Sequence, residues 1–149
     1  MTGKADFTEE EWKAVLEGPT SAGLVVIASD RGGSVRETFS MAKAYSEARE
    51  KRGASQLLDE IVTSKPEMDR SRYSSPEEMK DGALDNVREA VAIVKAKASR
   101  EELDDYKQFI LGLAQHVAEA RKEGFMGLSG ERVSDAEREA IGQISGALG

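Results

Sequence analysis

The residues with the clearest capacity to bind a ligand lie in one glycine-rich segment near the C-terminus. Gly124, Gly127 and Gly130 are spaced three apart, and glycine permits positive φ values and close approach of the backbone to another group. Three glycines within seven residues predict a loop of defined shape between two helices. The simplest interpretation is that this loop ends one helix and anchors the next one, without a ligand.

A divalent cation is the first ligand that this loop could bind. Glu131, Asp135 and the loop carbonyl groups would supply the hard oxygen ligands that Ca²⁺ and Mg²⁺ prefer. The spacing differs from that of an EF-hand loop, which places oxygen ligands at alternate positions and a Glu at the twelfth. We therefore expect a modest site at best, with Asp30 from the first half of the chain as a third candidate ligand.

Phosphate is the second ligand that a glycine loop before a helix can hold, because the helix N-terminus presents free N–H groups. Here Asp135, Glu137 and Glu139 occupy the opening of the following helix. They complement the helix dipole and would repel an anion. The segment also lacks the Lys and the Ser or Thr of a P-loop, so the sequence argues against a phosphate site.

Few residues of the chain could support catalysis. There is no Cys, which excludes a thiol nucleophile, a zinc-thiolate site, an iron-sulfur cluster and a disulfide scaffold. His116 is the only histidine and adjoins Val117 on the edge of an apolar stripe, which is typical of a structural residue. A ferritin-like di-iron site needs two Glu-x-x-His motifs, and Leu113 stands where the Glu would precede His116. We predict no catalytic and no cofactor-binding residue.

Size and charge limit the class of protein further. A chain of 149 residues is the usual size of one domain. The 28 Asp and Glu outnumber the 21 Lys and Arg, which gives a net charge of −7 and leaves no basic face for nucleic acid or an anionic membrane. No run approaches the roughly 18 apolar residues of a membrane span, and no secretory signal opens the chain. We expect a cytoplasmic protein with no nucleic-acid partner and no membrane insertion.

Helix starts are strongly marked in the sequence. In a capping box, a Ser or Thr accepts from the backbone N–H three residues later, and a Glu there reaches back to the N–H of the cap. Five such pairs precede apolar-periodic segments: Thr8 with Glu11, Ser34 with Glu37, Ser75 with Glu78, Ser99 with Glu102, and Ser134 with Glu137. Phe7 and Trp12 flank the first pair as a hydrophobic staple. Pro19 and Pro76 are predicted to mark helix starts, since proline is tolerated in the first turn.

The apolar periodicity agrees with these starts and predicts an all-α bundle of about seven helices. Their expected ranges are 8–17, 19–29, 34–51, 54–64, 76–98, 100–122 and 135–148. The two longest, 76–98 and 100–122, are expected to pack as an antiparallel pair because their connection is so short. The run 23–30 could be a strand by propensity, but no second strand-like run could pair with it, so we predict a buried helix.

The chain divides into two similar halves, about 1–65 and 75–149, which are expected to form one domain with two pseudo-repeated parts. The irregular stretch from Lys65 to Ser75 is predicted to cross between them. A small-ligand or enzyme pocket between the halves, near this crossover and the glycine loop, remains an alternative to a non-enzymatic domain. Self-association through an apolar helix face is a third interpretation.

The ending from Leu128 to Gly149 resembles the close of TerB-type tellurite-resistance domains, in which a Ser and a Glu precede an amphipathic helix that ends in Leu-Gly. The segment from Ala28 to Glu37 is similar to the matching motif in the first half of that family. Asp30, Glu37 and Glu137 fall on acidic positions of the motif. The chain also resembles uncharacterised bacterial helical proteins with a glycine-rich loop before Val-Ser-x-x-Glu.

The resemblance implies an all-helical fold, an acidic surface, a divalent-cation site and a link to stress response rather than to catalysis. From these observations the sequence predicts a non-enzymatic binding or adaptor domain that takes a protein partner or weakly binds Ca²⁺ or Mg²⁺.

Overall fold

The computed structural model of the protein describes residues 3–29, 35–51, 55–64, 73–123 and 135–149, and within these ranges it is helical without any strand. A short 3₁₀ turn, η1 (Lys4–Asp6), precedes the α-helices. These are α1 (Glu9–Ser29), α2 (Val35–Glu50), α3 (Gln56–Thr63), α4 (Pro76–Lys97), α5 (Arg100–Glu123) and α6 (Asp135–Leu148). The predicted all-α bundle is therefore confirmed, with six helices in the described ranges instead of about seven.

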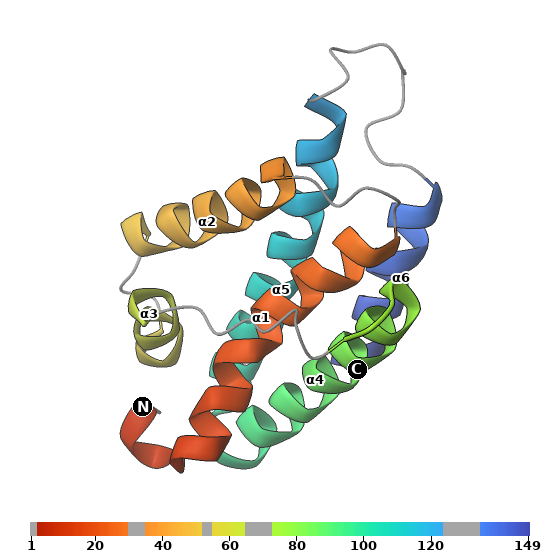
Figure 1. The fold of residues 1–149 in the computed structure, drawn as a ribbon. Coiled ribbons are helices and arrows are strands. Elements are labelled where there is room, and N and C mark those ends of the chain that lie inside the picture. The colour runs from red at the N-terminus through yellow and green to blue at the C-terminus, as the bar shows by residue number, and fades with distance from the viewer. Residues whose placement is uncertain (1–2, 30–34, 52–54, 65–72, 124–134) are drawn as a thin grey trace.

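The difference of one helix lies at Pro19, which is inside α1 and does not start a new helix. A proline removes the N–H that would bond to the carbonyl four residues earlier, which here belongs to Val15. The Tyr106 hydroxyl of α5 donates to that carbonyl at 2.6 Å. The prediction of a break was wrong because a tertiary hydrogen bond replaces the one that proline removes. Figure 1 shows α1 bending along its length, as helices commonly do at proline.

Gly18 makes room for this contact between α1 and α5. A Cβ atom built at Gly18 would lie 2.2 Å from the Tyr106 hydroxyl oxygen and 2.9 Å from the Ala90 Cβ atom of α4. Both distances are shorter than van der Waals contact, so any side chain at this position would push α4 and α5 away. The Gly18-Pro19 pair thus marks a place of close approach among α1, α4 and α5.

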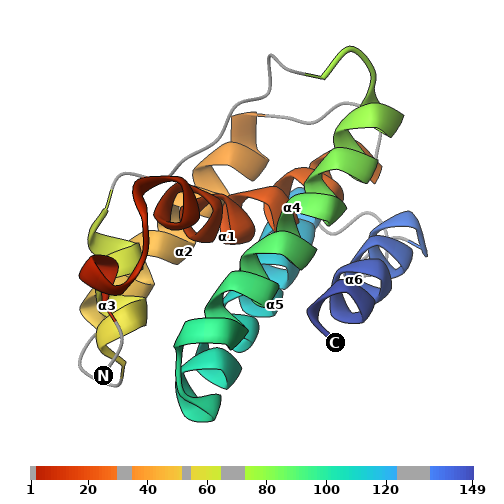
Figure 2. The ribbon, with the colours of Figure 1, turned by 90° about the horizontal axis from the view of Figure 1, so that it is seen from below.

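Helix α1 lies at the centre of the packing. It contacts α4 most extensively and α5 next, while α6 packs against α4, α1 and α5. Helices α2 and α3 lie on one side of the molecule and α6 on the other (Figures 1 and 2). The fully buried Val15, Val25, Val87, Ile110 and Ile144 come from both halves of the chain and belong to one hydrophobic core.

The expected pairing of the two longest helices is only partly correct. Helices α4 and α5 are joined through Ala98 and Ser99, as the sequence predicts. However, each of them packs more extensively on α1 than on the other, and Figure 1 shows them diverging from their connection. A short connection requires that two helices start close together, but it does not decide what fills the space between them.

Two of the capping boxes are confirmed in full and a third in part. The Thr8–Glu11 and Ser99–Glu102 pairs each form both reciprocal hydrogen bonds, at 2.9 to 3.2 Å. The Ser75 hydroxyl accepts from the Glu78 N–H at 3.1 Å, but the Glu78 carboxylate accepts from the Ser74 hydroxyl instead of the Ser75 N–H; Pro76 occupies the first turn of α4 as predicted. The boxes at Ser34 and Ser134 lie outside the described residues. Ser55 caps α3 by accepting from the Leu58 N–H. No Glu lies three residues after Ser55, so the capping-box pattern did not indicate this cap.

Candidate functional site

The predicted ligand-binding residues lie largely outside the described part of the chain. This holds for Asp30, Glu131 and the glycines at 124, 127 and 130. Asp135 is the first residue of α6, but its side chain is likewise outside the description. Among the residues that the structure does describe, no three His, Asp or Glu side chains come together as a metal site would require. The predicted cation site therefore stays a prediction.

The structure does place the helices to which these segments are attached. The end of α1, the start of α2, the end of α5 and the start of α6 all lie toward the upper end of the bundle in Figure 1. Helix α2 packs on α5, and α6 packs on both α1 and α5. The two segments that resemble the TerB motif, one between α1 and α2 and one between α5 and α6, are thus attached at the same end of the molecule.

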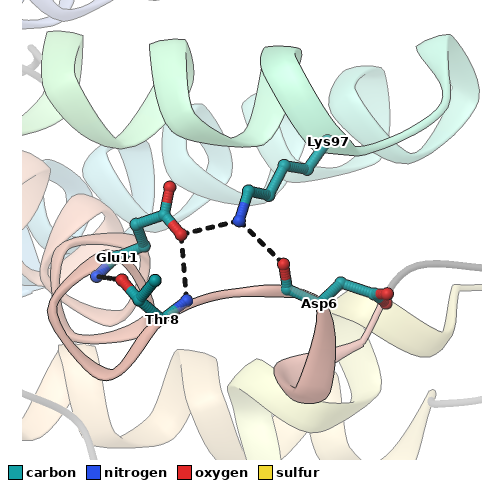
Figure 3. Close-up of polar contacts among 4 residues, drawn as sticks. All are labelled: Asp6, Thr8, Glu11 and Lys97. Atoms are coloured by element: carbon teal, nitrogen blue, oxygen red, sulfur yellow. Dashed lines mark hydrogen bonds and ion pairs between the residues drawn. The ribbon is translucent and has the colours of Figure 1, made fainter.

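A polar cluster at the opposite end joins the N-terminal segment to α4 (Figure 3). The Lys97 ammonium donates to the Glu11 carboxylate at 2.6 Å and to the Asp6 backbone carbonyl at 2.8 Å. The same ammonium lies 5.5 Å from the centre of the Phe7 ring, within range of a cation–π contact. Both Lys97 and Glu11 keep about a third of their side-chain surface exposed.

Lys97 of α4 and its contacts Asp6, Phe7 and Glu11 make up this cluster, which we call the Lys97 clasp. The Lys97 hydrogen bond, followed by the Thr8 N–H, lowers the pKa of the Glu11 carboxyl below its usual value of 4.5. The carboxylate is thereby kept charged, and its Oε1 atom accepts from both the Thr8 N–H of the cap and the Lys97 ammonium (Figure 3). Phe7 and Trp12 pack with their rings 5.7 Å apart, which confirms the predicted staple. We interpret the clasp as a structural contact that attaches the start of α1 to the end of α4.

Polar side chains also fill the interface between α1 and α4. The Asn86 amide of α4 donates to the Tyr73 hydroxyl at 3.2 Å and to the Ser21 hydroxyl of α1 at 3.4 Å. The Tyr73 ring lies against Gly82, where a Cβ atom would be 2.5 Å from it. Thr20 donates to the Glu17 carbonyl at 3.1 Å within α1. These groups satisfy one another and hold the chain that enters α4 against α1.

Two buried tyrosines differ in their hydrogen bonding. Tyr106 is fully buried and donates to the Val15 carbonyl. Tyr45 of α2 is 2% exposed, and its hydroxyl has no hydrogen-bond partner in the part of the chain that is described. Its ring meets the Phe109 ring of α5 edge to face, with the centres 5.3 Å apart. Burial raises the pKa of both phenols well above the usual value of 10, so neither hydroxyl can act as a base near neutral pH.

Sequence analysis missed Tyr45 and the interaction of Tyr106. Tyr106 follows the apolar period of its helix and was therefore expected in the core, but its partner lies 91 residues away. Pro19 carried the available signal, since a proline within an apolar helix leaves a carbonyl that some donor must satisfy. His116 is half-buried on α5 beside the fully buried Val117, as its place in the sequence predicts.

Comparisons with protein-family models, with curated proteins and with solved structures find no match for this chain. The TerB resemblance therefore remains at the level of the two segments that suggest it. Within the ranges that the structure describes, no helix is both long and apolar enough to cross a membrane.

Proposed function

We propose that this protein is a non-enzymatic helical binding or adaptor domain of a bacterial stress-related system, with a weak divalent-cation site where the two TerB-like segments are attached. The observation that supports the proposal is the arrangement of four helix ends. Helices α1 and α5 end, and α2 and α6 begin, toward one end of the bundle. The described helix ends that border these two segments, which are about 100 residues apart in the chain, therefore lie toward the same end of the bundle.

Two of these four helix ends, the C-termini of α1 and α5, favour a cation. The C-terminus of a helix carries a partial negative charge and carbonyl oxygens without an intrahelical partner. Asp30 directly follows the last residue of α1, and Asp135 is the first residue of α6. Carboxylate and carbonyl oxygens are the ligands that Ca²⁺ and Mg²⁺ prefer. Asp30, Glu131 and Asp135 are the proposed ligands, and either cation fits this set of oxygens.

Calorimetric titration with calcium and with magnesium tests the cation site, with thermal unfolding as a second measurement. We expect binding in the millimolar range, and at ten times the dissociation constant a stabilisation of about 1.4 kcal/mol. The substitutions Asp30→Asn and Asp135→Asn should each weaken binding, and Glu131→Gln should do the same. Asp85→Asn is the matched control, because Asp85 is exposed on α4 and pairs with Arg88 at 2.9 Å. No heat and no thermal shift at millimolar metal would exclude the site.

The binding or adaptor part of the proposal has a separate test. Sedimentation at several concentrations distinguishes a monomer from a self-associating protein, and metal can be added to each sample. An assembly that changes with metal would make self-association the adaptor function. A monomer at every concentration, with and without metal, would leave a different protein as the partner and reject self-association.

A further inference from the structure

Among the described residues, helix α2 packs extensively on only one other long helix, α5, whereas α4, α5 and α6 each pack on several. Helix α2 packs mainly on α5 and on the short α3, and it contacts α1 only slightly. Within residues 41–50, where the structure describes its side chains, only Met41 and Tyr45 are buried. Ala44 and Ala48 are half-buried against the core, and the other six residues are exposed.

One of these two buried side chains carries an unfavourable feature. The Tyr45 hydroxyl leaves water when α2 docks, and it gains no hydrogen-bond partner among the described residues. A buried hydroxyl in this state disfavours docking by about fivefold to a hundredfold in the equilibrium constant. The edge-to-face contact with Phe109 and the burial of the ring act in the opposite direction. Tyr45 therefore stabilises the docking of α2 less than a side chain of its size would with a satisfied hydroxyl.

The second buried side chain depends on a glycine of α1. A Cβ atom at Gly23 would lie 2.3 Å from the Met41 sulfur and 3.3 Å from a methyl carbon of Leu113. Met41 therefore occupies space that any side chain at position 23 would take. This is one of the places where α2 reaches α1, and the contact is made by one flexible thioether.

We infer that α2 opens from α5 as a unit while α1, α4, α5 and α6 remain packed, and that the Tyr45 hydroxyl sets how readily it opens. Opening hydrates this hydroxyl and breaks the contact between the Tyr45 ring and the Phe109 ring of α5. Local opening of this kind occurs in elements with few buried contacts, at a free energy below that of global unfolding. The rest of the bundle has the reverse character, because α1 is buried along most of its length between α4, α5 and α6.

Hydrogen exchange of the full chain, followed by mass spectrometry, tests this inference with the variant Tyr45→Phe. The ring and its contact with Phe109 are kept, and only the unpartnered hydroxyl is removed. In the original protein we expect the amides of residues 41–50 to exchange faster than those of α4, and in the variant we expect them to exchange about fivefold to a hundredfold more slowly than in the original. Faster or unchanged exchange in α2 would overturn the inference, because it would show that the hydroxyl does not disfavour docking. Equal opening free energies for α2 and α4 in the original protein would also overturn it, since the two would then open together.

A second variant approaches the same opening from α1. Gly23→Ala should displace the Met41 side chain and speed exchange in residues 41–50 at least severalfold. Gly112→Ala on α5 is the matched control, because a Cβ atom there meets nothing within 4 Å. Exchange in α2 that responds equally to both substitutions would contradict the role of Met41 and the separate opening of α2.

Discussion

Tyr106 and Tyr45 are both buried tyrosines that attach a helix to α5, yet they do so in opposite ways. Tyr106 donates to a carbonyl that Pro19 has left without its usual N–H, so one hydrogen bond satisfies two buried groups. Tyr45 buries a hydroxyl for which the described residues offer no acceptor. The first arrangement fixes α1 at the centre of the bundle, while the second leaves α2 weakly attached at its side. Burial alone therefore does not measure how firmly a side chain holds its helix.

Gly18→Ala tests the firm attachment of α1 through Tyr106, and we expect it to change the free energy of unfolding more than any other substitution proposed here. The new methyl group would overlap the Tyr106 hydroxyl at 2.2 Å and approach Ala90 at 2.9 Å. Overpacking costs about 1–3 kcal/mol, and loss of the buried hydrogen bond adds about 1–3 kcal/mol. We expect the free energy of unfolding to fall by about 3 kcal/mol or more, measured by urea unfolding.

Gly112→Ala is the control for that substitution. It makes the same change in a helix without any Cβ contact, and we expect it to raise stability by about 0.5–1 kcal/mol. A Gly18→Ala protein as stable as the control would show that α4 and α5 can move away from α1 at little cost.

Tyr106→Phe is expected to have the next largest effect. It keeps the ring but leaves the Val15 carbonyl buried without a donor, which should lower the free energy of unfolding by about 1–3 kcal/mol. Tyr45→Phe, measured in the same urea experiment, should raise the free energy of unfolding by about 1–3 kcal/mol, because the unpartnered hydroxyl is hydrated in the unfolded chain. Equal losses in the two variants would remove the distinction between the tyrosines.

The smallest effect is expected at the Lys97 clasp, which fastens the exposed start of α1. Because the pKa of Glu11 is lowered in the folded protein, its contribution to stability is present above pH 4.5 and is lost as the pH falls through the lowered value. Lys97→Met should make the loss of stability on acidification smaller. At neutral pH it should lower the free energy of unfolding by less than Tyr106→Phe does. Urea unfolding between pH 3 and pH 7, at low and at high salt, measures both.

The steepness with which stability falls below pH 4.5 shows whether Lys97 lowers the pKa of Glu11. A Lys97→Met protein whose stability falls as steeply as that of the original below pH 4.5 would show that the Thr8 cap alone lowers the pKa of Glu11. Arg88, which pairs with Asp85 on the exposed face of α4, provides the control: Arg88→Met removes a surface ion pair and should change little.

The candidate site could be predicted only to the level of residue types. The acids and glycines at 30, 124–131 and 135 indicate an oxygen-rich segment, but their mutual distances depend on how α1, α2, α5 and α6 are packed. The structure shows that the helices carrying both segments end or begin at one end of the bundle. No spacing in the chain encodes that arrangement, because the segments are about 100 residues apart.

The sequence by itself determined the helices, their starts and their apolar faces. These features depend on residues three or four positions apart, such as Thr8 with Glu11 and Ser99 with Glu102, which interact within one helical turn. Only the tertiary structure decided that α1 continues through Pro19, that α1 lies between α4 and α5, and that the buried Tyr45 hydroxyl has no hydrogen-bond partner among the described residues. Those outcomes depend on groups such as Tyr106 and Val15, which are 91 residues apart and meet only when the whole core packs.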